Sequence, residues 1–188
     1  MADTNYTILS INPGSTSTRI AVYRNESLLF QKKVDHPAES LRVYESNVAQ
    51  FPIRLDAILK ALEEEKFDLR QLSAVAGRGG KLPPLQQGAY IVDEGMLDFL
   101  RHRPIDDHAS NLGALLAHEI AKPLNIPSYI YDAVVMDQME DIAKLSGQPE
   151  MRRKASCHAL NMRAMAIKAA TNKGWKLADK NIIVSHMG

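Results

Sequence analysis

Four side chains suited to phosphate chemistry each follow a short apolar run typical of a buried strand: Asn12, Arg78, Asp132 and His186. In open α/β sheets, ligands bind at the carboxyl ends of strands, where side chains leave the core. A guanidinium binds an oxyanion bidentately, a carboxylate holds magnesium directly or through water, and an imidazole can donate to a moving phosphoryl group. The set therefore predicts phosphoryl transfer, although each residue alone also fits a structural role in a turn or a helix cap.

A turn rich in hydroxyl side chains follows the first apolar run. The runs at 7–11 and 19–23 are predicted strands, and the Asn-Pro-Gly-Ser sequence between them is typical of a hairpin turn. Its backbone N–H groups and hydroxyls could hold phosphate oxygens. It is not a Walker loop, because no Gly-Lys-Ser/Thr follows, and an ordinary Ser/Thr-rich hairpin turn remains the alternative. The predicted phosphate-binding residues of this turn are Asn12, Gly14, Ser15, Thr16, Ser17 and Thr18.

The elements that must position these residues form a mixed α/β pattern. Tight turns join the first three predicted strands, which favours an antiparallel meander, and strands then alternate with helices. A mixed sheet covered by helices is expected rather than an all-parallel one. In the helix at 52–66, the spacing of Leu55, Ile58, Leu59 and Leu62 predicts the buried stripe. Further strands are expected at 27–34, 72–76, 89–92, 128–131 and 181–185, and further helices at 93–100, 110–122, 137–145 and 156–173.

Composition narrows the class of protein. The 188 residues suit one domain or one and a part, and 23 basic against 22 acidic residues give a net charge of +1. This balance predicts no nucleic-acid or anionic-membrane partner. The single Cys157 and the absence of an apolar signal core at the start favour a cytoplasmic protein without a membrane anchor. A polar stretch at 148–154 predicts a boundary between domains at 1–149 and 150–188.

The remaining histidines are interpreted from their neighbours. His108 precedes a helix beside Asp106 and Asp107, so it either caps that helix or faces the cleft as a donor. Cys157 and His158 are expected to be structural, because no other metal ligands converge on them. Surface positions are expected for His36, His102 and His118.

Six segments, in order along the whole chain, resemble the signatures of the butyrate kinases of the acetokinase family. The resemblance implies the ribonuclease-H-like fold shared by actin, sugar kinases and heat-shock ATPases, in which two such domains enclose ATP and the acceptor. The matching segments are 11–18, 77–80, 108–113, 131–135, 158–161 and 186–188.

The resemblance also implies roles for individual residues. Asn12 and the turn from Gly14 to Thr18 match the family's first phosphate hairpin, near a magnesium ion. Arg78, followed by Gly79, matches the arginine that binds the acyl carboxylate or acyl phosphate. The remaining matches are Asp132 for metal and catalysis, His108 for a cleft histidine whose following residues differ from the family pattern, and His186 for the histidine that opens the second phosphate loop.

The reaction implied is the reversible transfer of the γ-phosphate of ATP, with Mg²⁺, to butyrate or a similar short-chain acid, giving an acyl phosphate. A carboxylate is already ionised near neutral pH, so positioning and charge neutralisation would supply most of the catalysis. A homo-oligomer is expected from the resemblance.

Family chains continue for about as many residues again, so we expect this chain alone to have little or no kinase activity. The sequence leaves two alternatives open. One is a non-catalytic module that binds an anion or a partner with the same half-fold, and the other is a kinase of the superfamily that acts on a sugar.

Overall fold

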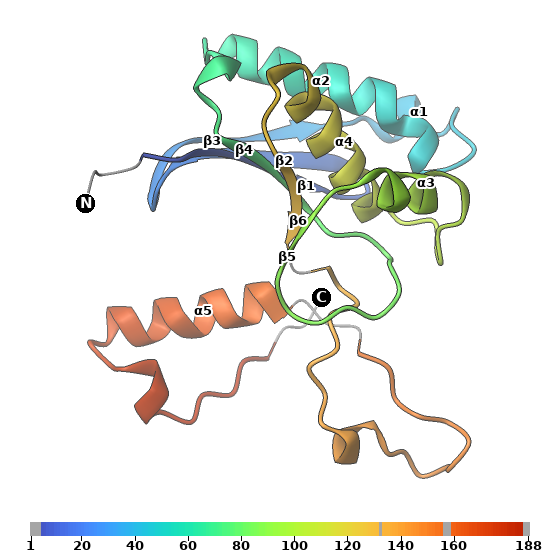
Figure 1. Cartoon of the computed structure of the whole chain (residues 1–188), viewed down its shortest axis with the longest axis vertical. Helices are drawn as coiled ribbons and strands as arrows, with labels where there is room; N and C mark the ends of the chain where they lie inside the picture. Colours follow the sequence, from blue (N-terminus) through green and yellow to red (C-terminus); the bar gives the residue numbers. More distant parts are fainter. Residues whose placement is uncertain (1–4, 132, 156–158, 186–188) are drawn as a thin grey trace.

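One mixed sheet of six strands forms the centre of the protein (Figure 1). The computed structural model describes residues 5–131, 133–155 and 159–185. The first three strands form the expected antiparallel meander, β1, β4 and β6 are parallel, and β5 is antiparallel to β6. The predicted mixed sheet is confirmed. In spatial order the strands are β3 (Ser27–Asp35), β2 (Ser17–Arg24), β1 (Thr7–Pro13), β4 (Ala74–Arg78), β6 (Ser128–Tyr131) and β5 (Ala89–Ile91).

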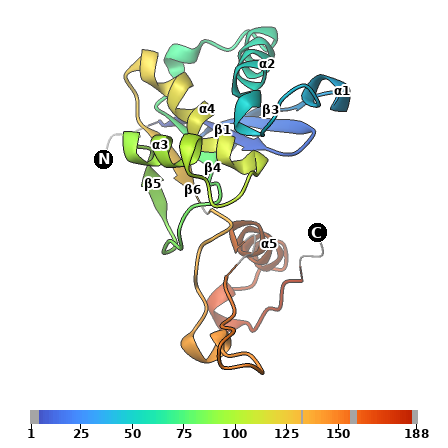
Figure 2. The same cartoon turned by 90° about the vertical axis from the view of Figure 1, so that its right-hand side faces the viewer.

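Helices cover one face of this sheet and build the core there. Along β1, Leu9 and Ile11 are fully buried, whereas Ser10 and Asn12, which follow them in turn, are half-buried and point to the opposite face. The buried face packs against α2 (Phe51–Glu64) and α4 (Leu112–Ala121), which lie above the sheet in Figure 2. The other helices are α1 (Ala38–Leu41), α3 (Glu94–His102) and α5 (Ala159–Asn172).

α5 lies on the other side of the sheet from α2 and α4 (Figures 1 and 2). Most of its residues are exposed or half-buried, and Ala170 is its one fully buried position among those described. Within the described part of the chain, no helix has both the length and the apolar character needed to cross a membrane.

β4 and α4 approach each other closely at two glycines. A Cβ on Gly77 would overlap the carbonyl oxygen of Gly113, and a Cβ on Gly113 would overlap the carbonyl oxygen of Arg78. Only hydrogen fits at either position, because packed carbon and oxygen atoms need more than 3 Å. The glycine pair therefore seats the end of β4, and with it Arg78, against the start of α4.

Several sequence-based expectations need correction. The buried face of α2 is formed by Arg54, Ile58, Ala61 and Leu62, so Leu59, predicted to be buried, is 37% exposed. Residues 137–145 contain only a short 3₁₀ helix, Asp141–Lys144, instead of the expected α-helix. Residues 181–185 form no strand, because the described chain places no strand beside them to complete their hydrogen bonds.

The predicted surface position of His36 is also wrong, because this residue is buried. The residue is 4% exposed, and its Nε2 lies 2.9 Å from the hydroxyl of Thr18 on β2. A surface position is confirmed for His102, which contacts Asp98, whereas His118 is half-buried in α4.

Candidate functional site

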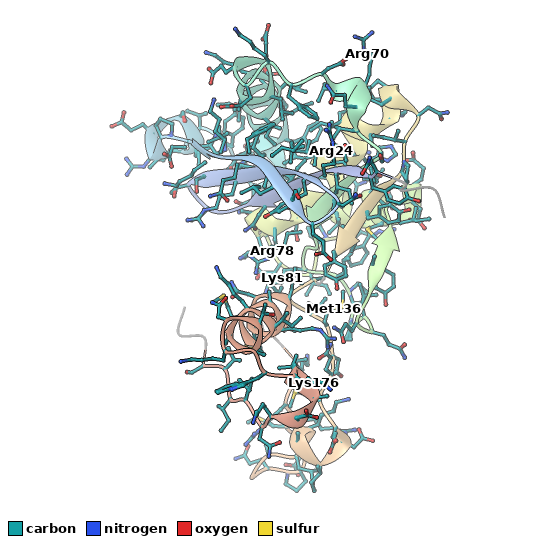
Figure 3. The ribbon with its side chains drawn as sticks, turned by 90° about the vertical axis from the view of Figure 1, so that its left-hand side faces the viewer. Arg24, Arg70, Arg78, Lys81, Met136 and Lys176 are labelled. Carbon is teal, nitrogen blue, oxygen red and sulfur yellow. The ribbon has the colours of Figure 1, made fainter. Side chains whose placement is uncertain are left out.

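The carboxyl ends of the parallel strands β1 and β4 bring Asn12 and Arg78 together, as predicted. Nη1 of Arg78 donates a hydrogen bond of 3.3 Å to Oδ1 of Asn12, and both residues are half-buried. Arg78 extends from the sheet on the side that faces α5 (Figure 3). The guanidinium is thus held at the sheet end where α/β proteins bind ligands.

Two predicted catalytic residues lie outside the described residues. Asp132 follows Tyr131, the last residue of β6, which is paired with Arg78 in the neighbouring strand. His186 lies in the last segment of the chain, and Cys157 with His158 precede α5; none of these is described.

The β1–β2 turn is held by hydrogen bonds from within and from below. The N–H of Gly14 donates to the carbonyl of Ser17 at 2.7 Å, which closes the turn. Beneath it, the buried guanidinium of Arg54 donates to the carbonyl oxygens of Gly14 and Ser15 at 2.8 and 2.9 Å. Thr18 is fully buried, so its hydroxyl faces Arg54 and His36 instead of a ligand.

His108 stands just before α4 with its ring partly exposed. The backbone N–H of Ser110 donates to Nδ1 of His108 at 3.1 Å, and the Ser110 hydroxyl lies 2.7 Å from the same atom. Because Nδ1 accepts from a backbone N–H, the neutral ring carries its proton on Nε2. Burial, together with the charge of Lys81, lowers the pKa of His108 below its usual value of 6.5. The imidazole is therefore a neutral Nε2–H donor at pH 7.

Asn111 links the His108 segment to the loop that follows Arg78. Its side chain is fully buried, accepts from the backbone N–H of Lys81 at 2.8 Å, and donates to the carbonyl of Asp106 at 2.8 Å. One amide thus spans the two segments that carry the guanidinium and the imidazole. Sequence analysis noted Asn111 only as part of a matching segment and assigned it no role.

A polar cavity of about 340 Å³ opens between these groups. Arg78 and Arg19 give it two guanidinium groups, and Asp107 its one carboxylate among the described residues. Both carboxylate oxygens of Asp107 accept from the backbone N–H of Asn47, at 2.9 and 3.1 Å. The cavity therefore favours an anion. Its remaining lining residues are Asn12, Pro13, Gly14, Ser15, Ser17, Asn47, His108 and Ala109.

A second, more apolar cavity of about 500 Å³ shares Asn12 and Arg78 with the first. It lies between the open face of the sheet and α5, and therefore extends from the guanidinium toward apolar side chains. The apolar lining includes Ile11, Ala76, Leu160, Ala164 and Met165.

The predicted site residues divide into two groups. Asn12, Gly14, Ser15, Ser17, Arg78 and His108 line the polar cavity, whereas Thr16, Thr18 and Gly79 line neither cavity. The N–H of Gly79 donates to the carbonyl of Tyr131 at 3.5 Å. Sequence reasoning missed Arg19, which alternation on β2 could have placed beside Asn12, its partner across the strand pair.

The chain is similar in sequence to known proteins. The chain is 46% identical over 184 residues to a probable butyrate kinase of Clostridium botulinum and 44% identical over 183 residues to butyrate kinase 1 of Clostridium acetobutylicum. These alignments cover 98% and 97% of this chain but 52% of each relative, so the chain spans about half the length of the curated relatives it matches. No family model matches the chain.

The fold is similar to half of a solved structure. The acetate kinase of Porphyromonas gingivalis superposes with a TM-score of 0.58 at 17% identity, over 92% of this chain and 50% of that one. In sequence the chain is therefore similar to about half of a butyrate kinase, and in fold to half of an acetate kinase.

Proposed function

We propose that this chain is the phosphate- and acceptor-binding half of a short-chain carboxylate kinase, which transfers the γ-phosphoryl group of ATP to butyrate or a similar acid. The observation that carries the proposal is the pairing of Arg78 with Asn12 where a polar and an apolar cavity meet. An acyl phosphate has a matching polarity, with an anionic group at one end and a short alkyl chain at the other.

Arg78 would bind the carboxylate or acyl phosphate oxygens, and the apolar cavity would take the alkyl chain. The ionised carboxylate oxygen attacks the γ-phosphorus, the bond from that phosphorus to the bridging oxygen breaks, and ADP leaves with the electron pair. The Nε2–H of His108 and the guanidinium of Arg19 would stabilise charge on the transferring group. No strong general base is required, because the acceptor is already ionised.

Asn12 gives the polar cavity one amide oxygen, a type of ligand that Mg²⁺ accepts beside substrate phosphates. Among the described residues, no cluster of three or more His, Cys, Asp or Glu side chains could hold a metal ion. Mg²⁺ needs no such cluster, since it keeps several waters and binds through substrate phosphates with one or two protein ligands. Asn12 would hold the ion through the second lone pair of Oδ1, together with Asp132, and the ion would neutralise phosphate charge.

We further propose that residues 1–149 form this domain, whereas 150–188 belong to the start of a nucleotide-binding domain. α5 supports this division, because most of its surface is uncovered by the described chain. On this proposal the 188 residues alone turn over little or no substrate. An ATP-coupled acyl phosphate assay with turnover near that of a full-length butyrate kinase would contradict it.

Binding to the 188-residue chain tests the substrate class. Butyryl phosphate, butyrate and isobutyrate should shift the amide resonances of Asn12, Arg78 and His108, and glucose should not. The variant R78K keeps the charge but loses the bidentate fork, and we expect it to bind butyryl phosphate at least about tenfold more weakly. Shifts with glucose alone would favour a sugar kinase. Phosphate binding that ignores the acyl chain would favour a non-catalytic anion module.

A further inference from the structure

Arg54 is a fully buried arginine whose charge no carboxylate balances within the described part of the chain. It lies in the first turns of α2, on the same face as Ile58, and its guanidinium fits below the β1–β2 turn. A buried arginine is usually paired with an acid, because an isolated buried charge is costly. This exception calls for a specific reason.

Every N–H of the guanidinium is used. Nε and Nη2 donate to Oε1 of Gln50 at 3.1 and 2.8 Å. The other three bonds go to the turn: to the carbonyls of Gly14 and Ser15, and at 3.3 Å to the hydroxyl of Thr18. The five donors of arginine are thus matched by five hydrogen bonds, and all acceptors are neutral.

These bonds set the direction of two peptide groups. In a trans peptide the C=O and the N–H point in opposite directions. Since the carbonyls of Gly14 and Ser15 point to Arg54, the N–H groups of Ser15 and Thr16 point away from it, to the solvent side of the turn. Neither of these two N–H groups donates to an acceptor among the described residues. Gly14, Ser15 and Ser17 border the polar cavity on that side.

The charge of Arg54 also extends through Thr18 to His36. The Thr18 hydroxyl accepts from Nη1 of Arg54 and lies 2.9 Å from Nε2 of His36, so it links the guanidinium to the imidazole. Burial and then the charge of Arg54 lower the pKa of His36, and only Asp35 opposes them. Thus His36 reports the charge of Arg54 without contacting the cavity.

We propose that Arg54 is a positioning residue that orients the Ser15 and Thr16 N–H groups toward a bound phosphate and places an unbalanced positive charge behind them. This inference rests on the proposed function, because it assumes that the turn binds phosphate. On this proposal, one buried side chain sets the shape of the anion site and supplies part of its positive electrostatic potential.

The variant Q50E separates these two effects. Glutamate has nearly the shape of glutamine and can accept the same two bonds from Arg54, but it cancels the charge. R54M removes both the charge and the bonds, and R70M removes an exposed arginine 85% accessible at its side chain, which makes it the matched control. Circular dichroism and amide spectra establish that each variant is folded.

Inorganic phosphate is the probe. Its binding to the 188-residue chain is monitored through the amide resonances of Ser15 and Thr16. We expect the phosphate Kd to rise about threefold or more in Q50E and about tenfold or more in R54M, and to stay unchanged in R70M. The pKa of His36, measured from its ring resonances, should rise in both Q50E and R54M.

The outcomes separate the two levels of the proposal. If wild-type protein binds phosphate at the turn and Q50E binds it equally well despite a raised His36 pKa, the role of Arg54 is refuted and the proposed function stands. If wild-type protein binds no phosphate at this turn, both are refuted. Should R54M fail to fold, Q50E alone decides.

Discussion

Replacing Gly80 with alanine should loosen the contact that holds the two sides of the site together. A Cβ at this position would lie 2.6 Å from Oδ1 and 2.8 Å from Cα of Asn111. An ordinary contact needs at least about 3.4 Å, so Asn111 must move by more than half an ångström. Since one of the atoms met belongs to the backbone, rotation of the side chain cannot relieve the overlap.

The energetic cost follows from what Asn111 does. Its two buried side-chain hydrogen bonds, to Lys81 and Asp106, contribute about 1 kcal/mol each, and overpacking adds about 1–3 kcal/mol. We therefore expect Gly80→Ala to lower the free energy of unfolding by about 3–5 kcal/mol. For a domain of this size, that corresponds to a fall in Tm of about 6–20 °C.

Urea and thermal denaturation measure the effect, with Gly147→Ala as the control. No atom lies within 4 Å of a Cβ at Gly147, so this variant should match the wild type. The Ser110 and Lys81 amide resonances should shift in Gly80→Ala, since they report the two sides of the Asn111 contact. A Gly80→Ala protein as stable as Gly147→Ala, with both resonances unmoved, would refute the reasoning.

Three further predictions follow from the same geometry. The chain should lose stability as the pH falls below 6.5 toward the lowered pKa of His36. The reason is that the unfolded chain then binds a proton that the folded chain binds less readily. His36→Gln should therefore flatten the profile of the free energy of unfolding, measured with urea, between pH 7.5 and 5. Equal slopes in the two proteins would contradict this. Asn111→Ala should lower the free energy of unfolding by about 2–3 kcal/mol, because it leaves the Lys81 N–H and the Asp106 carbonyl without partners. The control Asn172→Ala, at an exposed helix end, should lower it by less than about 0.5 kcal/mol in the same urea denaturation assay. Arg19→Gln should weaken inorganic phosphate binding about threefold or more in an NMR titration, with no change in Tm, because the side chain is exposed at the polar cavity; unchanged affinity would remove Arg19 from the site.

The sequence alone predicted the mixed sheet and the approach of Asn12 and Arg78 for identifiable reasons. Turn residues and alternating apolar residues predict β1 to β3. The positions of Asn12 and Arg78 at the ends of apolar runs predict that both lie at one edge of the sheet. Those signals are local. The strand expected at 181–185 failed for the same reason, because its apolar pattern is local whereas its hydrogen-bond partners are not.

Buried polar residues were hardest to predict. Arg54 lies four residues before Ile58 and seven before Ala61, so helical spacing places it on the buried face, but an arginine on a helix is usually assigned to solvent. His36 gave no comparable signal. His36 follows β3 and contacts a hydroxyl 18 residues away on β2, and such a pairing emerges only when the sheet is assembled.

The mixture of parallel and antiparallel strands in the sheet affects how the protein folds. β1 forms a local hairpin with β2, yet its other edge waits for β4, and Asn12 meets Arg78 across 66 residues of chain. Pairing strands that are so far apart in the sequence is slow compared with forming a local hairpin. The β1–β2 turn should thus acquire its shape before Arg78 joins it, and the proposed anion site should be complete only after β4 has paired with β1.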